Sequence, residues 1–136
     1  MNTYNINDKE FLKSETYQKF KEENPAYGNL KIRVSAANGA VPIKGAKAIV
    51  SKEIENNNVI FFEGYTDESG VIEKISLPTP ELDMNDMDVP EKATYKLVIK
   101  YLPENVDQTY DVNMYDNICV VQNINIVPNL NLKGED

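Results

Sequence analysis

GNLKIRVSAANGAVPIKGAKAIV, residues 28–50, opens with apolar and polar side chains in strict alternation. Leu30, Ile32 and Val34 occupy every second position, and basic residues stand between them. A period of two predicts a β-strand with one face buried and the other in solvent, because successive side chains of a strand point to opposite faces. The stretch therefore begins with a half-buried strand.

Turn residues follow, and a second segment repeats the arrangement. Asn38-Gly39 and the segment PIKGA, residues 42–46, contain the Gly, Pro and Asn that tight turns require. Downstream, YTDESGVIEKISL, residues 65–77, places the turn Asp67–Gly70 between two further alternating runs. The chain thus alternates short strands with tight turns.

Seven strand-like runs follow Gly28 at short intervals. Repeated short strands separated by turn signals favour a β-sandwich over alternating strands and helices. We expect a mainly β protein, a seven-stranded β-sandwich over residues 28–128, with a hairpin tip at Asn56–Asn58. The runs are Asn29–Ala36, Ala46–Glu53, Asn58–Tyr65, Gly70–Leu77, Thr94–Leu102, Gln108–Met114 and Cys119–Val127.

Residues 1–27 are expected to form a short N-terminal helical arm. A helix can begin at residues 7–10, NDKE, and must end near Pro25. A helix this short is marginal alone, so its apolar side must dock on another surface. That surface is either the chain's own sandwich or a partner chain, and the sequence leaves both open. The apolar side chains at roughly helical spacing are Phe11, Leu12, Tyr17 and Phe20.

The segment 78–91, PTPELDMNDMDVPE, is the longest irregular stretch of the chain. Long loops of compact domains often form interfaces. We therefore expect Leu82, Met84 and Met87 to contact a partner, together with the helical arm. Residues 129–136 are expected to form a polar C-terminal tail.

The charge balance restricts the kinds of partner. The chain has 22 acidic and 14 basic residues, which gives a net charge of −8. Such a surface repels phosphate backbones and anionic lipids, so we expect neither nucleic-acid nor membrane binding. The first residues contain neither a basic nor an apolar segment of the kind that a Sec signal peptide requires, so synthesis without such a signal is expected.

Catalysis and cofactor binding are not expected. The chain contains no His, which excludes Ser-His and Cys-His pairs and the usual zinc ligand sets. Cys119 is the single cysteine and lies in an apolar run, where we expect it to be buried as a small hydrophobic residue. We therefore expect no enzyme and no cofactor.

Two clusters of polar or aromatic residues leave alternatives open. The carboxylates of the 78–91 segment could hold calcium, but they lack the EF-hand pattern and are better explained as a solvated loop. The C-terminal tyrosines could form a strip that binds sugars or proteins, although packing is their commoner role. The residues concerned are Glu81, Asp83, Asp86 and Asp88, and Tyr95, Tyr101, Tyr110 and Tyr115.

The motifs PIKGA and TDESG, in this order, resemble those of carboxypeptidase regulatory-like domains. This resemblance implies that the seven-stranded sandwich is of the prealbumin-like (transthyretin-like, Ig-like) Greek-key type. ATYKLVI, residues 93–99, and NICVVQNINIVP, residues 117–128, are similar to the N-terminal sandwich of clostridial spore cortex-lytic proteins. The resemblance covers residues 28–128 and includes no catalytic domain. It implies a non-catalytic module and gives no active-site residue.

The chain also resembles small accessory proteins of phage tails and tail-like particles of Gram-positive hosts. This resemblance implies a structural or assembly component, such as a baseplate or tail accessory protein, in a virion or particle assembled in the cytoplasm. Its partners would be other protein subunits, bound through the arm and the 78–91 loop. The alternative is a spore or cell-wall module that binds glycan or peptidoglycan.

Related sandwiches called CnaB domains contain a Lys–Asn isopeptide bond, and we predict that this chain lacks one. In those domains an inward-facing lysine of the first strand forms the bond, whereas the alternation here points Lys31 outward. Asn123 and Asn125 near the last strand could supply the other partner, but no lysine matches them. The intact mass should equal the sequence mass, and a mass lower by one ammonia would contradict this prediction.

Overall fold

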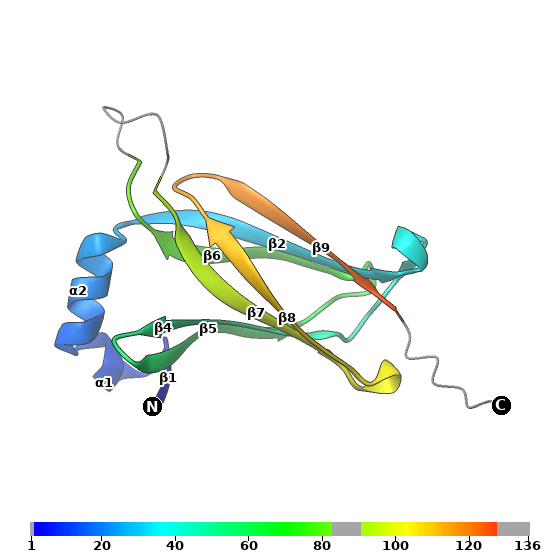
Figure 1. The fold of residues 1–136 in the computed structure, drawn as a ribbon, viewed down its shortest axis with the longest axis horizontal. Coiled ribbons are helices and arrows are strands. Elements are labelled where there is room, and N and C mark those ends of the chain that lie inside the picture. Colours follow the sequence, from blue (N-terminus) through cyan, green and yellow to red (C-terminus); the bar gives the residue numbers. More distant parts are fainter. Residues whose placement is uncertain (1, 83–90, 128–136) are drawn as a thin grey trace.

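The computed structural model describes residues 2–82 and 91–127, and these form a two-layer β-sandwich (Figure 1). One sheet has the order β1 (Thr3–Asn5), β5 (Asn57–Tyr65), β4 (Lys47–Ile54), β7 (Ala93–Tyr101) and β8 (Val106–Met114). The other has the order β3 (Val41–Pro42), β2 (Ala26–Ala36) and β6 (Val71–Thr79), and β9 (Cys119–Ile126) pairs with β2. The expected mainly β sandwich is confirmed.

All seven expected runs are strands, and two short strands add to them. β1 pairs in parallel with β5, and β3 pairs with the end of β2. The hairpin tip between β4 and β5 begins one residue before the expected tip, Asn56–Asn58. Ile54 pairs with Asn57, so Glu55 and Asn56 form the tip, and both have positive φ angles of 47° and 64°. Two such residues in succession are typical of the twisted turns that join hairpin strands.

The main core lies between the two sheets and contains the inward side chains of both. Leu30, Ile32 and Val34 have no exposed surface, so the alternation in β2 places its apolar set inside as expected. β9 runs parallel to β2 along its whole length and adds Ile124 and Ile126 to this core. The first and last long strands are therefore neighbours.

The chain crosses between the sheets before β4 and after β5, and these two crossings are hydrogen-bonded to each other at Thr66. The Thr66 hydroxyl donates to the carbonyl of Ile43 (2.6 Å) and accepts from the N–H of Ala46 (3.0 Å). The backbone N–H of Thr66 donates to the Ala46 carbonyl (2.9 Å). Thr66 is 4% exposed, so these bonds are shielded from water. They join the PIKGA turn to the TDESG turn.

The TDESG turn is also fixed against β2. The Asp67 carboxylate accepts from the N–H groups of Ser69 (2.8 Å) and Val71 (3.0 Å), which confirms Asp67 as a turn-forming residue. Gly70 has a φ angle of +76°, and a Cβ there would lie 2.4 Å from the Val34 carbonyl oxygen. Only glycine suits a position with this φ angle and so little space.

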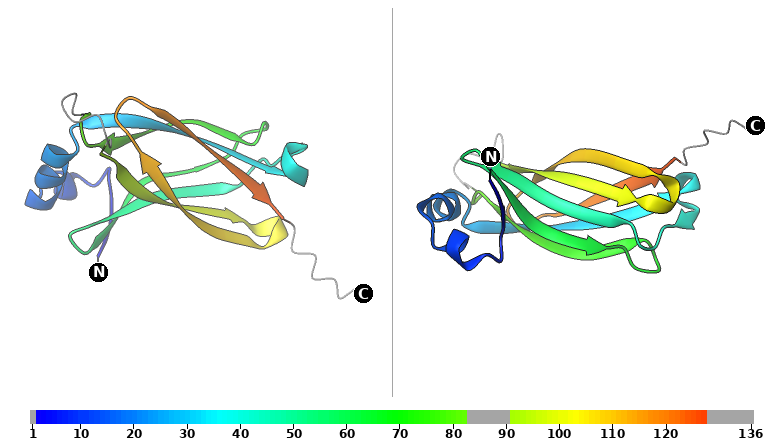
Figure 2. Two further views of the ribbon diagram at one scale, coloured as in Figure 1. Left: turned by 45° about the horizontal axis from the view of Figure 1, so that its top comes forward. Right: turned by 90° about the horizontal axis from the view of Figure 1, so that it is seen from below.

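Two short helices, α1 (Lys9–Leu12) and α2 (Glu15–Glu23), cover one end of the sandwich (Figure 2). The side chains of Asp8 and Ser14 cap them by accepting from backbone N–H groups of the first turn. Phe11 and Phe20 form a second buried cluster with residues of the β4–β5 hairpin. The arm therefore docks on its own sandwich, which decides between the two possibilities that the sequence left open.

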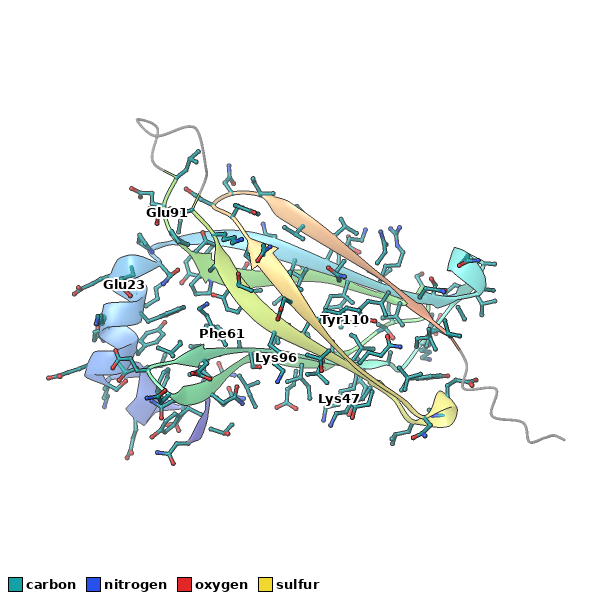
Figure 3. All side chains as sticks on the ribbon, viewed as in Figure 1. Glu23, Lys47, Phe61, Glu91, Lys96 and Tyr110 are labelled. Atoms are coloured by element: carbon teal, nitrogen blue, oxygen red, sulfur yellow. The ribbon has the colours of Figure 1, made fainter. Side chains whose placement is uncertain are left out.

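Phe61 of β5 connects this second cluster to the main core. Its ring lies 5.8 Å from that of Phe20 and 5.2 Å from that of Tyr95, measured between centroids. Figure 3 shows Phe61 extending from β5 toward the space between the two sheets. Because aromatic pairs of this geometry attract each other beyond simple burial, Phe61 couples the helices to the sandwich interior.

The Thr66 bonds predict the effect of an isosteric substitution. Thr66→Val keeps the volume but removes the hydroxyl, which leaves the Ile43 carbonyl and the Ala46 N–H without this partner. The free energy of unfolding should fall by about 1–3 kcal/mol in urea denaturation.

Thr109→Val, at an exposed site on β8, is the matched control and should change stability by less than about 0.5 kcal/mol. Equal stabilities of the two variants would show that the Thr66 bonds contribute nothing net.

Candidate functional site

The arm residues expected to contact a partner are largely occupied within their own chain. Phe11 and Phe20 are 4% and 5% exposed, because Ile54 and Val59 of the β4–β5 hairpin cover them. Leu12 and Tyr17 are half-buried. The apolar side of the arm therefore completes the fold, and it offers little free apolar surface to another protein.

The 78–91 segment is described at its two ends. Leu82 is 39% exposed, and its backbone N–H donates to the Asp116 carboxylate (2.9 Å). The other expected residues of this segment lie outside the described residues: Asp83, Met84, Asp86, Met87 and Asp88. Across residues 2–82 and 91–127, no group of three or more His, Cys, Asp or Glu side chains is placed to hold a metal ion.

The four C-terminal tyrosines do not form one exposed strip. Tyr95 is 1% exposed, and its hydroxyl donates to the carbonyl of Pro78 (2.5 Å). Tyr101 and Tyr110 pack against the main core. Tyr115 is different, since it lines a groove at the end of the sandwich.

This groove, the end groove, is the candidate site. It lies where the β8–β9 turn meets the start of β2 and the two described ends of the 78–91 segment, and its volume is about 670 Å³. Figure 3 shows Glu91 at this end of the molecule. The lining residues are Tyr27, Leu82, Tyr115 and Ile118, with Glu91, Asp116 and Asn117 as polar members.

The end groove gathers exposed apolar side chains from three separate segments. Tyr27 is 49% exposed, Ile118 is 47% exposed, and Leu82 is similar. Scattered exposed apolar residues are ordinary, but a contiguous group with polar residues around it is typical of a binding surface. The sequence analysis identified Leu82 and Tyr115, and it missed Tyr27 and Ile118. The signal for Tyr27 was an aromatic residue directly before Gly28 and the expected strand Asn29–Ala36.

Backbone hydrogen bonds hold the groove walls in place. The N–H of Asn117 donates to the Tyr27 carbonyl (2.9 Å), and the N–H of Asn29 donates to the Ile118 carbonyl (3.0 Å). Between them, a Cβ at Gly28 would lie 2.4 Å from the Tyr115 carbonyl oxygen. A glycine is therefore needed for the β8–β9 turn to lie this close to β2.

A lysine from α2 contacts one of the groove residues. The Lys21 ammonium lies 4.1 Å from the centroid of the Tyr27 ring and donates to the Tyr27 hydroxyl (2.7 Å). A cation over an aromatic face is attracted by the ring electrons. This contact fixes the Tyr27 ring and joins the arm to the groove, although the arm's own apolar side is buried.

The chemistry available in the end groove is that of binding. Its side chains offer aromatic and aliphatic surface, two carboxylates and an amide. These groups can make hydrophobic contacts, stack on a ligand and form hydrogen bonds. Among its described lining residues, none pair as a nucleophile and an adjacent base of the kind that covalent catalysis requires.

The structure contradicts the prediction for Cys119 and confirms the one for Lys31. Cys119 is exposed, so the prediction that it is buried was wrong. In the parallel pair with β2 it lies beside Asn29, on the outer face of the sheet, because the alternation in β9 buries Ile124 and Ile126 instead. Lys31 lies on the same outer face, with its ammonium 3.4 Å from the Glu73 carboxylate.

Burial changes the acid–base behaviour of several groups outside the groove. It lowers the pKa of Lys52, whose ammonium donates to the Thr94 carbonyl (2.9 Å). It raises the pKa of Tyr95 strongly and that of Tyr110 as well. Burial also raises the pKa of Tyr17, and the nearby Tyr27 raises it further.

Comparison with known proteins gives no assignment: no protein-family model matches this chain, and no curated protein matches it. In the part of the chain that the structure describes, no helix is long and apolar enough to cross a membrane.

The buried phenol of Tyr95 predicts how stability depends on alkaline pH. Its pKa is raised in the folded state, so the stabilisation is fully present below the unfolded value of about 10 and is lost as the pH rises above it. Between about pH 10 and pH 11, the free energy of unfolding should therefore fall more steeply for the wild type than for Tyr95→Phe.

Tyr65→Phe is the matched control because Tyr65 is 64% exposed, and it should keep the wild-type slope. If Tyr95→Phe also kept that slope, Tyr95 would not be the group responsible.

Proposed function

We propose that the chain is a non-catalytic structural or assembly module that binds another protein subunit through the end groove. The sequence predicted that the arm contacts the partner, but the apolar side of the arm is packed within the chain. The proposed contact surface is instead the groove at the end of the sandwich. This surface includes Leu82, which the sequence analysis expected to contact a partner, together with Tyr27, Tyr115 and Ile118.

The observation that carries the proposal is the convergence of exposed apolar side chains at one rigid place. Tyr27, Leu82 and Ile118 come from three segments, and hydrogen bonds of the backbone hold all three. Aromatic and aliphatic anchors on a preformed surface are typical of protein interfaces. Backbone groups that are already hydrogen-bonded lower the ordering cost of forming an interface.

The biological setting rests on the sequence resemblance. Carboxypeptidase regulatory-like sandwiches and phage tail accessory proteins suggest a component of a phage tail or tail-like particle of a Gram-positive host, assembled in the cytoplasm. The hydrogen bonds between the PIKGA and TDESG turns support this resemblance, because they give both motifs a common structural role. The net charge of −8 supports a protein partner over nucleic acid.

The second candidate is a spore or cell-wall module that binds glycan or peptidoglycan. The observation in its favour is the composition of the same groove. Two tyrosine rings stand beside the polar groups of Glu91, Asp116 and Asn117. Aromatic faces with hydrogen-bonding groups at their edges can stack on a sugar and bind its hydroxyls.

A double substitution in the groove tests the proposal. The tagged chain is produced together with the proteins encoded beside its gene, and the complex is isolated. Tyr27→Ala with Ile118→Ala should lower recovery in the complex at least about tenfold, because loss of interface anchors costs more than 1 kcal/mol each. The matched control is Val41→Ala with Leu102→Ala, two exposed apolar positions in β3 and in the β7–β8 turn, and it should bind normally. Figure 1 shows the β7–β8 turn at the end of the sandwich opposite α2.

Cosedimentation with purified peptidoglycan separates the two candidates. Binding of the wild type that the groove variant loses would favour the glycan function. Incorporation into a complex that the groove variant retains would contradict the proposed assembly role of the groove.

A further inference from the structure

The edge strands of the two sheets differ in how they are protected against pairing with another strand. β1 has three residues, β8 carries Asp107 and Asp111, and β6 carries Glu73, Lys74 and Pro78. Short edges, charges and prolines all hinder edge-to-edge association. β9, with the sequence CVVQNINI, is eight residues long and has no charge and no proline.

The outer side of β9 has unpaired backbone groups. The N–H of Asn29 donates to the Ile118 carbonyl, which sets the phase of the parallel ladder. In such a ladder every second residue directs both its N–H and its C=O toward the neighbouring strand, and the others direct theirs away. Within the described residues β9 pairs with β2 alone, so the groups directed away have no strand partner. They belong to Cys119, Val121, Asn123 and Asn125.

The side chains of this row are exposed and uncharged. Val121 is 47% exposed, and Asn123 and Asn125 are exposed amides. The Asn125 side-chain oxygen accepts from the N–H of Asn38 (3.1 Å). The Asn123 amide both donates and accepts, so it can pair with another amide. Figures 1 and 2 show β9 at the margin of its sheet. A long, uncharged, unpaired edge is a template for a further strand.

We propose that β9 pairs antiparallel with β9 of a second copy of this chain, about a two-fold axis. The charge pattern argues for a second copy as the occupant. In a two-fold contact the same strand faces itself, so any charge on it would face like charges across the axis. β9 avoids this in a molecule of net charge −8, whereas β8 would bring its aspartates together.

The positions of the free groups also select the register, because an axis at Gln122, the centre of the four outward residues, lets all four pair. An axis at Gln122 places Val121 opposite Asn123 of the second copy and Cys119 opposite Asn125 of the second copy. Each of these residues then uses its outward N–H and C=O in the new ladder. The sheet becomes continuous from β6 of one copy to β6 of the other. This contact is separate from the end groove and does not depend on the proposed function.

Sedimentation equilibrium under reducing conditions tests the proposal. The wild type should form a concentration-dependent dimer of twice 15.4 kDa. Asn123→Pro removes an outward N–H and leaves the ladder with β2 intact, since prolines are tolerated on strand edges. Val121→Glu places acidic groups across the axis. Both variants should raise the dissociation constant at least about tenfold, an effect of about 1.4 kcal/mol or more. At a concentration where all three proteins are monomeric, their thermal midpoints should be equal.

Thr109→Glu adds the same charge to the edge of β8 and should dimerise like the wild type, as should the groove variant Tyr27→Ala. A monomeric wild type up to about 1 mM, where the binding free energy would be weaker than about −4 kcal/mol, would overturn the proposal. A dimer that persists in Val121→Glu would overturn it equally.

A cysteine pair tests the register. Asn125→Cys, with the native Cys119, should form an intermolecular disulfide on mild oxidation. Directly opposed residues of a hydrogen-bonded antiparallel pair lie about 5.5 Å apart at Cα, which suits a disulfide. Thr109→Cys is the control and should not form this cross-link. Failure of Asn125→Cys to cross-link, in a preparation that dimerises, would overturn the axis at Gln122.

Discussion

The hydrogen bonds of Thr66 are the constraint on which the rest of the sandwich depends. One hydroxyl joins the crossing that leads into β4 to the crossing that leaves β5, and both crossings connect the same two sheets. Gly70 lets the second crossing lie against β2, with the Val34 N–H donating to its carbonyl (2.7 Å). Because these polar groups are buried, each needs its partner, and the relative position of the sheets follows from satisfying them.

The N-terminal arm is part of the folded unit. Phe11 and Phe20 cover the β4–β5 hairpin, and the Phe61 ring continues this contact to Tyr95 in the main core. The Tyr95 hydroxyl donates to the carbonyl of Pro78 in β6, the strand that leads into the segment beside the end groove. Packed aromatic rings therefore connect the arm to the core, and a hydrogen bond connects the core to the strand that leads toward the groove. A rigid scaffold of this kind suits a protein that presents fixed surfaces to partners.

The sequence predicted the strands well and the exposed surfaces poorly. The reason is that strand patterns are local in the chain, whereas the surfaces form from segments that are far apart in it. Alternation within β2 is local, so Leu30 and Val34 could be placed inside from the sequence alone. Cys119 was placed wrongly because its run is apolar on both faces, so composition could not say which face meets the core. Tyr27 and Ile118 meet only when β2 and the β8–β9 turn pair, and no local pattern records that contact.

The sequence by itself determined the class of fold, the PIKGA and TDESG turns and the absence of histidine chemistry, because period-two alternation, Gly-Asn-Pro turns and composition act locally. The tertiary structure decided three further points. The arm covers its own sandwich, the apolar side chains of three segments form one groove, and β9 alone among the long edge strands of the described chain lacks a charge. Each point depends on which strands become neighbours, and that is settled by burial and hydrogen bonding between segments far apart in the chain.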